Sequence, residues 1–135
     1  IVHLGIGCKR NTPLERIEEL VLPELERMDL DKRSIAGIAS VDLKKDEQCL
    51  LAFAEKYNFP AHFYSADELN ALEGDFTPSA FVQSVVGVSN VCERSAVRDA
   101  KCGRLALRKT SRNGVTLAIA VEDLVLDFQH TGLKK

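Results

Sequence analysis

The sequence predicts an α/β fold: a three-layer α/β/α sandwich with a mixed, mostly parallel sheet and a late β-hairpin. Apolar runs of strand length alternate with segments of helical periodicity through the first half of the chain. Near the end, Asn113-Gly114 separates two alternating segments, which is a strong hairpin signal. The length of 135 residues is typical of one domain.

The first half of the chain predicts three strand-and-helix pairs. Thr12 and Glu15 form a capping-box pattern at the start of the first helix, and Pro23 is expected to kink or interrupt that helix. Ser65 and Glu68 form a second capping box. The predicted strands are 1–6, 34–41 and 61–64, and the predicted helices are 12–29, 46–57 and 65–72.

The second half predicts two more helices and the hairpin. Asn90 is a good cap for the second of these helices, because Asn accepts hydrogen bonds from the first turn. The helices are expected at 78–85 and 91–100, the hairpin strands at 104–110 and 115–121, and a loose tail at 123–135.

Composition excludes several classes of protein. The net charge is −2 with both signs interspersed, which argues against a nucleic-acid surface. Uncharged runs are too short for a membrane span and no signal peptide is visible, so a cytoplasmic protein is expected. The 4 cysteines include no C-x-x-C pair, so we expect reduced thiols and no metal site or cofactor. The chain begins with Ile, as expected for a piece of a longer protein or a processed chain.

The segment GIGCKR, from Gly5 to Arg10, links the first strand to the first helix. It fails the dinucleotide fingerprint because Arg10 stands where the third glycine belongs, and it lacks the Lys-Ser or Lys-Thr pair of a P-loop. We expect Gly5 and Gly7 to form a tight turn, with Lys9, Arg10 and the helix N-terminus favouring a carboxylate or a phosphate. The alternative is an ordinary turn with solvated basic residues.

The second predicted strand ends at Ser40-Val41-Asp42, where ligands of α/β sheets commonly bind. A carboxylate at this place suits a general base or a group that orients substrate, so Asp42 is a candidate. GIGCKR and Asp42 are expected to share one edge of the sheet. The alternative for the charged run that follows, through Glu47, is a solvated helix start.

Cys92 and Glu93 fall in the first turn of the predicted helix 91–100. A helix N-terminus favours a thiolate, so Cys92 is a candidate nucleophile, although a buried inert thiol is the commoner case. Glu93 is equally well explained as a capping carboxylate. On the late hairpin, Lys109 and Thr116 are placed to face the same edge, in the most basic region of the chain. The alternative is a hairpin edge kept from pairing by positive charge.

Four segments taken together resemble the C-terminal domain of the cobalamin-biosynthesis protein CbiG and its stand-alone relative CobE. They are 5–12, 38–47 and 87–93, then Lys109 with 115–120. The resemblance covers almost the whole chain and defines a domain of residues 1–122. One departure is Asn11, which stands where the family pattern G-x-G-C-x-x-G-T has glycine; Asn tolerates the left-handed backbone that glycine adopts.

The resemblance implies a role in building the corrin ring. Full-length CbiG is a cobalt-precorrin-5A hydrolase that opens a δ-lactone and releases acetaldehyde, whereas CobE has only this domain. The implied ligand is a precorrin or cobalt-precorrin, whose metal arrives with it, and other corrin-pathway enzymes are possible partners. The alternative is a CobE-like binding protein without hydrolase chemistry. Candidate catalytic residues are Asp42, Glu93 and Cys92; candidate substrate-binding residues are Gly5, Gly7, Cys8, Lys9, Arg10, Thr12, Ser40, Lys44, Glu47, Lys109 and Thr116.

Overall fold

A computed structural model describes residues 1–9, 11–42, 47–72, 76, 90–101 and 103–122. Five strands form one sheet in the order β3-β2-β1-β5-β4. The pairs β1–β2 and β2–β3 are parallel, and the pairs β1–β5 and β5–β4 are antiparallel, so the sheet is mixed as predicted. The strands are β1 (Val2–Cys8), β2 (Ile35–Val41), β3 (Ala61–Tyr64), β4 (Arg104–Arg112) and β5 (Val115–Val121).

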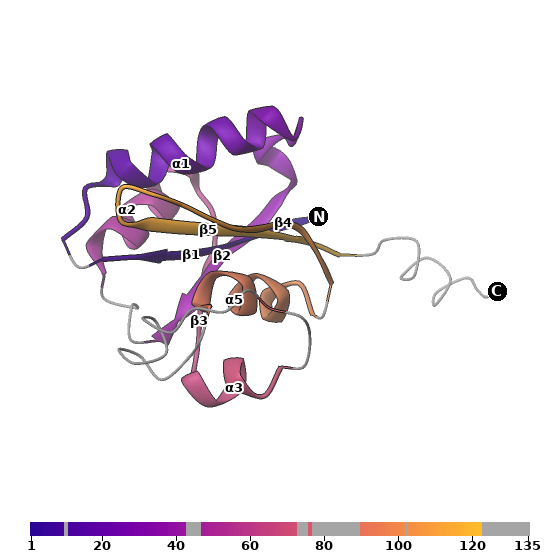
Figure 1. The fold of residues 1–135 in the computed structure, drawn as a ribbon. Helices are drawn as coiled ribbons and strands as arrows, with labels where there is room; N and C mark the ends of the chain where they lie inside the picture. The colour runs from indigo at the N-terminus through magenta and orange to yellow at the C-terminus, as the bar shows by residue number, and fades with distance from the viewer. Residues whose placement is uncertain (10, 43–46, 73–75, 77–89, 102, 123–135) are drawn as a thin grey trace.

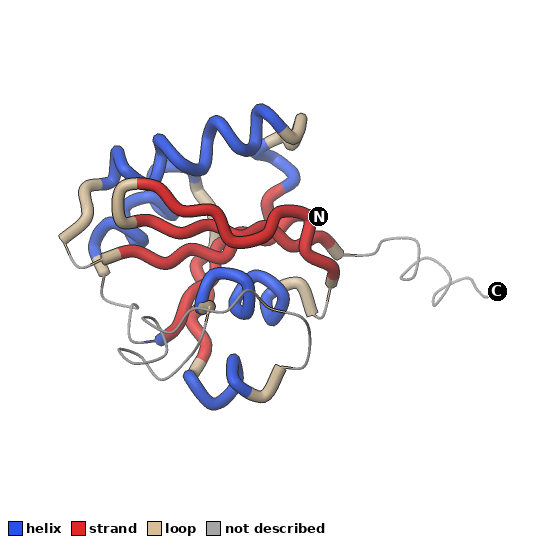
Figure 2. The backbone as a smooth tube through the Cα atoms, in the orientation of Figure 1, coloured by secondary structure: helices blue, strands red, loops and turns tan. Residues whose placement is uncertain are grey.

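Helices cover both faces of the sheet, which confirms the three-layer arrangement (Figure 1, Figure 2). On one face lie α1 (Leu14–Arg27) and α2 (Gln48–Tyr57), which pack on each other as well as on the sheet. On the other face lie α5 (Val91–Asp99), against β1, β2 and β5, and the short α3 (Ala66–Asn70) beyond it. A 3₁₀ turn, η1 (Lys32–Ser34), precedes β2.

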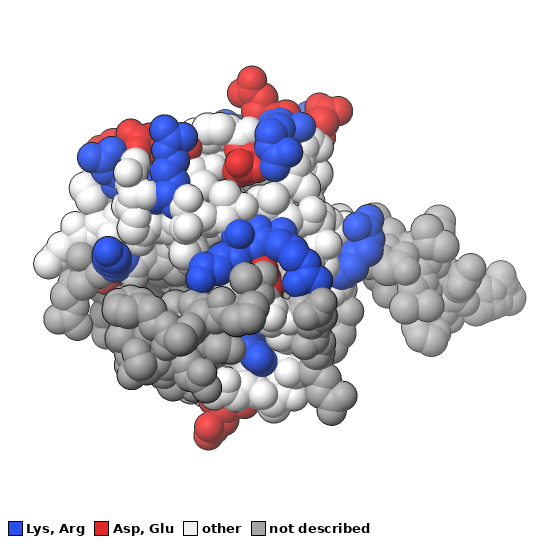
Figure 3. Space-filling model, in the orientation of Figure 1, with Lys and Arg blue, Asp and Glu red and all other residues white. Residues whose placement is uncertain are grey.

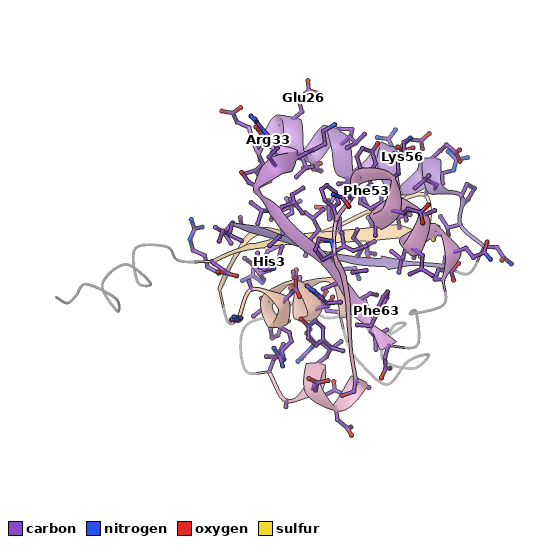
Figure 4. The ribbon with its side chains drawn as sticks, turned by 180° about the vertical axis from the view of Figure 1, so that it is seen from behind. His3, Glu26, Arg33, Phe53, Lys56 and Phe63 are labelled. Atoms are coloured by element: carbon purple, nitrogen blue, oxygen red, sulfur yellow. The ribbon has the colours of Figure 1, made fainter. Side chains whose placement is uncertain are left out.

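The main core lies between the sheet and the α1–α2 layer. Leu4 and Ile6 of β1 and Ile17 of α1 are completely buried there, and Phe53 of α2 lies between its helix and the sheet (Figure 4). A smaller cluster of alanines joins α5 to the opposite face. In the described part of the chain, no helix combines the length and the apolar character needed to cross a bilayer.

The structure corrects the prediction around the first turn. Strand β1 continues to Cys8, so Gly5 and Gly7 belong to the sheet and the turn follows them. Thr12 does not cap α1: the helix has Pro13 at its cap position without a side-chain bond, and the Thr12 hydroxyl donates to the Lys9 carbonyl instead. The helix continues through Pro23 to Arg27, so no interruption occurs.

Three other local predictions are confirmed. Ser65 and Glu68 form a capping box at α3, and the Asn90 side chain accepts from the Glu93 N–H at the start of α5. Asn113 and Gly114 form the hairpin turn with positive φ angles of 53° and 85°. The predicted helix 78–85 and the tail 123–135 lie outside the described residues.

Candidate functional site

Three helices begin at the edge of the sheet where β1 and β2 end. Since β1 and β2 are parallel neighbours, their carboxyl ends lie together, and α1 and α2 start from that edge. Helix α5 runs antiparallel to β1, with its first turn over Gly5 and its last residue bonded to His3, so its N-terminus faces the same edge. Helix N-termini attract anions, so this geometry favours a negatively charged ligand. We call Lys9, Asn11, Thr12, Asp42 and Glu47 the carboxyl-end rim.

The turn from β1 to α1 is held by hydrogen bonds within itself, to the hairpin and to the start of α2. The Lys9 N–H donates to the Gly114 carbonyl at 3.1 Å, and the Thr12 hydroxyl donates to the Lys9 carbonyl at 2.6 Å. Asn11 adopts the expected left-handed backbone with φ of 64°, and its N–H donates to Glu47 Oε2 at 3.4 Å. Thr12 and Glu47 therefore both hold the turn in place, while the Lys9 side chain is exposed at the rim.

Gly5 and Gly7 permit close packing rather than a turn, which corrects their predicted role. A Cβ at Gly5 would overlap the Cys92 carbonyl oxygen and stand 2.8 Å from the Ala96 backbone nitrogen. A Cβ at Gly7 would stand 2.7 Å from Thr116 Oγ1, which donates to the Gly7 carbonyl at 3.4 Å. The two glycines thus let α5 and Thr116 lie directly on β1.

Cys92 is 1 % exposed, and its thiol donates to Asn90 Oδ1 at 3.3 Å. Burial raises the pKa of Cys92 to about 12, although a hydrogen bond with Thr116 acts in the opposite direction. Of the two interpretations of Cys92, the structure favours the buried inert thiol over the nucleophile, because desolvation disfavours the thiolate. At neutral pH the Cys92 thiol is protonated and enclosed.

Glu93 is a structural link between α5 and β4. Its carboxylate is fully buried, Oε2 accepts from the Lys109 N–H at 2.6 Å, and Oε1 lies 3.9 Å from Arg108 Nη1. It does not cap α5. The structure brings Glu93 and Lys109 together inside the protein, through the backbone N–H of Lys109. Sequence could not reveal this bond, since it depends on the packing of α5 against the hairpin.

The basic residues of β4 lie on the edge strand of the sheet. Figure 3 shows Lys and Arg side chains gathered over the hairpin on the face in view. The two interpretations of this region are compatible: positive charge keeps the edge from pairing with another strand, and it also adds to the positive field. The strand contributes Arg104, Arg108, Lys109 and Arg112.

Ser40, the penultimate residue of β2, and Asp42, which follows the strand, are buried to different degrees. Ser40 is 2 % exposed, and within the described part of the chain its hydroxyl has no hydrogen-bond partner. It lies behind the surface of the rim, on the face covered by α1 and α2. Asp42 is half-buried at the rim itself. Arg10 and Lys44 lie outside the described residues.

A buried polar cluster near the opposite edge was missed by sequence reasoning. Asp99 of α5 accepts from His3 Nδ1 and His62 Nδ1, both at 2.7 Å, and from the Tyr64 hydroxyl at 2.6 Å. His3 Nε2 lies 2.7 Å from Glu122 Oε1. Figure 4 shows His3 between the sheet and α5. No local pattern signals this cluster, since its members come from four separate segments.

The fold and its rim define a single α/β domain whose helix N-termini converge on one edge of a mixed sheet. A crystal structure of CobE, a protein from the cobalamin (vitamin B12) biosynthetic pathway, superimposes with a TM-score of 0.81 at 29 % identity and covers 89 % of both chains. The model of the family "Cobalamin synthesis G C-terminus" matches residues 2–120. The chain therefore belongs to the CbiG C-terminal family, which confirms the resemblance.

Curated relatives fall into two kinds. The cobalt-precorrin-5A hydrolase of Priestia megaterium is 31 % identical over 121 residues, and that of Salmonella typhimurium is 34 % identical over 120 residues. The chain spans only about a third of these two proteins, 32 % and 34 % of their length. Protein CobE of a Sinorhizobium species is 33 % identical over 95 residues, which are 62 % of its length.

Proposed function

We propose that this domain acts in cobalamin biosynthesis by binding a precorrin or cobalt-precorrin at the carboxyl-end rim. We propose further that it does so as the C-terminal domain of a cobalt-precorrin-5A hydrolase, in the cytoplasm with other enzymes of the corrin pathway. The observation that carries the proposal is the convergence of three helix N-termini and the exposed Lys9 on one edge. Such an edge suits a macrocycle that carries several carboxylates. Family membership and the named relatives support the pathway.

Binding is tested by titrating the domain with a stable corrinoid and following the shift of its visible bands. Lys9→Glu is expected to weaken binding by about tenfold, because a cation that faces ligand carboxylates becomes an anion. Lys32→Glu is the matched control: Lys32 is also exposed but precedes β2, at the opposite edge of the sheet. Equal weakening by both variants, or no band shift with the wild-type domain, contradicts the proposed site.

The lactone-opening step needs a base that can reach water or substrate. Among the three catalytic candidates, Glu93 and Cys92 are enclosed in the packing of α5, which leaves Asp42 at the rim as the general base we propose. The hydrolysis would then proceed by attack of water on the lactone carbonyl, with helix N–H groups stabilising the oxyanion. Lactone hydrolysis would free a hydroxyl group on the extruded carbon. As that hydroxyl loses its proton and becomes the C=O of acetaldehyde, the C–C bond to the macrocycle breaks and the conjugated ring takes up the electron pair and a proton.

The chemistry is tested in a chimera that carries this chain in place of the C-terminal third of the Priestia megaterium hydrolase. Asp42→Asn in that chimera is expected to lower acetaldehyde release by at least about a hundredfold, the usual contribution of a positioned base, with corrinoid binding unchanged. Glu47→Gln serves as the control carboxylate, because Glu47 already accepts a bond from Asn11. Full turnover by the Asp42→Asn chimera contradicts the assignment.

A second candidate is a CobE-like protein that binds a precorrin without hydrolysing it. The match to the CobE crystal structure over 89 % of both chains favours it, as does the enclosure of Cys92 and Glu93. Corrinoid binding by the domain together with an inactive chimera would support this candidate over the hydrolase.

A further inference from the structure

Two cysteines from distant parts of the sequence meet beside the carboxyl-end rim. Cys8 is the last residue of β1 and Cys49 is the second residue of α2, yet their Sγ atoms lie 3.2 Å apart. Both side chains belong to the core cluster and are almost completely buried, at 8 % and 5 % exposure. A disulfide requires a sulfur separation of about 2.05 Å, so bond formation requires the two sulfurs to approach by roughly 1 Å.

The surroundings of the pair distinguish its two thiols. The hydrogen bond from Cys8 lowers the pKa of Cys49, and backbone N–H groups of the first turn of α2 act in the same direction; burial and the charge of Glu47 oppose them. A helix N-terminus is a typical setting for a reactive thiolate. Cys49 is therefore the nucleophile of the pair, and Cys8 is the neighbour positioned to attack it next.

We propose that Cys8 and Cys49 form an intramolecular dithiol–disulfide couple, oxidised by a small peroxide. The Cys49 thiolate attacks a peroxide oxygen, the O–O bond breaks, and hydroxide leaves to take up a proton, so that Cys49 becomes a sulfenic acid. Cys8 sulfur then attacks Cys49 sulfur, the S–O bond breaks, and the leaving hydroxide takes the Cys8 proton as water. Two thiols lose two electrons in total, and one peroxide is reduced to two waters.

The disulfide would join the end of β1 to the first turn of α2. Glu47, which accepts the hydrogen bond from Asn11 of the rim, is the residue that precedes α2, so the covalent link forms directly behind the rim. Cys92 provides an internal comparison. It is buried more deeply than either, at 1 % exposure, and it has Asn90 as its bonding partner and a raised pKa, so it is expected to stay reduced.

The test treats the whole chain with hydrogen peroxide, blocks remaining thiols with iodoacetamide, and digests with trypsin. The expected digest product is the peptide 1–9 joined to the peptide 46–56. Before blocking and digestion, the oxidised protein should weigh about 2 Da less than the reduced protein, and dithiothreitol should restore the original mass. Glutathione is included in the same reaction, and its oxidation shows that enough peroxide is present to oxidise a thiol. If glutathione is oxidised while both peptides are recovered alkylated and unlinked, or linked to Cys92 or Cys102, the proposal is overturned.

Two variants assign the roles of the sulfurs. In Cys8→Ser, Cys49 should accumulate as a sulfenic acid that dimedone labels, whereas in Cys49→Ser neither dimedone labelling of Cys8 nor an intramolecular disulfide is expected. Circular dichroism verifies that each variant is folded, and the wild-type digest tests the couple even if a variant is not. Dimedone labelling of Cys8 in Cys49→Ser at the wild-type rate would overturn the assignment of Cys49 as the nucleophile.

Discussion

Replacing Gly5 by alanine is expected to destabilise the domain by about 3 kcal/mol or more, the upper range for overpacking a core. The new methyl group would overlap the backbone of Cys92 and approach Ala96, and neither obstacle is a side chain that can rotate away. Relief requires α5 to move off the sheet, which also disturbs the bond from Glu93 to the Lys109 N–H. Thermal unfolding followed by circular dichroism measures the effect, expected as a loss of roughly 10 °C in Tm.

Gly7→Ala is the matched control, because Gly7 lies on the same face of β1, two residues further along. Its Cβ would meet a side-chain atom, Thr116 Oγ1, at 2.7 Å. In a Thr116→Ala background that obstacle is gone, so Gly7→Ala should then cost less than about 1 kcal/mol relative to Thr116→Ala alone. Gly5→Ala has no comparable rescue. A Gly5→Ala protein as stable as the wild type would show that α5 does not pack on β1 in this way.

Asp99→Asn is expected to have the other large effect, a loss of about 3–5 kcal/mol, typical of removing one partner from a buried ionic cluster. The Asp99 side chain is 2 % exposed and accepts bonds from His3, His62 and Tyr64. An amide cannot accept from all three donors, and it leaves His3 next to a neutral group. The cluster joins β1, β3 and α5, so its loss should loosen the α5 layer. Urea unfolding at pH 6 measures the change.

The same cluster predicts how stability depends on pH. Burial alone would lower the pKa of His3, but hydrogen bonds to Asp99 and Glu122 and their charges outweigh it and raise the pKa above its usual value. Both imidazole nitrogens face carboxylates, so only the imidazolium form can donate to both. The stabilisation is therefore complete below about pH 6.5, the usual pKa of histidine, and is lost as pH rises through the raised pKa.

Asp99 sets the lower pH limit of the stabilisation that the cluster provides. Burial would raise the pKa of this carboxyl, but bonds from His3, Tyr64 and His62 lower it overall. Its contribution is present above about pH 4, the usual pKa of aspartate, and is lost as pH falls through the lowered value. The contribution of the cluster should accordingly be greatest between about pH 4 and 6.5.

The measurement is Tm from pH 5 to 9 for the wild type and for His3→Gln. The wild type should lose stability across this range, whereas His3→Gln should show a flatter profile. Asp31→Asn is the control, because a side-chain bond with Arg33 lowers the pKa of Asp31 to about 2, outside the range measured. Parallel profiles for the wild type and His3→Gln would contradict a charged His3.

The sequence by itself determined the succession of strands and helices over the described residues, the mixed sheet and the family. These follow from local signals: hydrophobic periodicity, the caps at Ser65 and Asn90, and the Asn113-Gly114 turn all act over a few residues. The four separated segments were enough to recognise the family, because their order along the chain is visible without knowing which residues are in contact. Even the exception at Asn11 was predictable, since its left-handed backbone is a local property.

Only the tertiary structure decided what the side chains of those segments do. Gly5 proved to be a packing contact, Cys92 a protonated thiol and Glu93 a bond to the hairpin, because each depends on how closely α5 lies on the sheet. The pairing of Cys8 with Cys49 arises in the same way, across a separation of 41 residues. Burial and partners set the reactivity of such groups, and both are made by contacts between segments that no short stretch of sequence records.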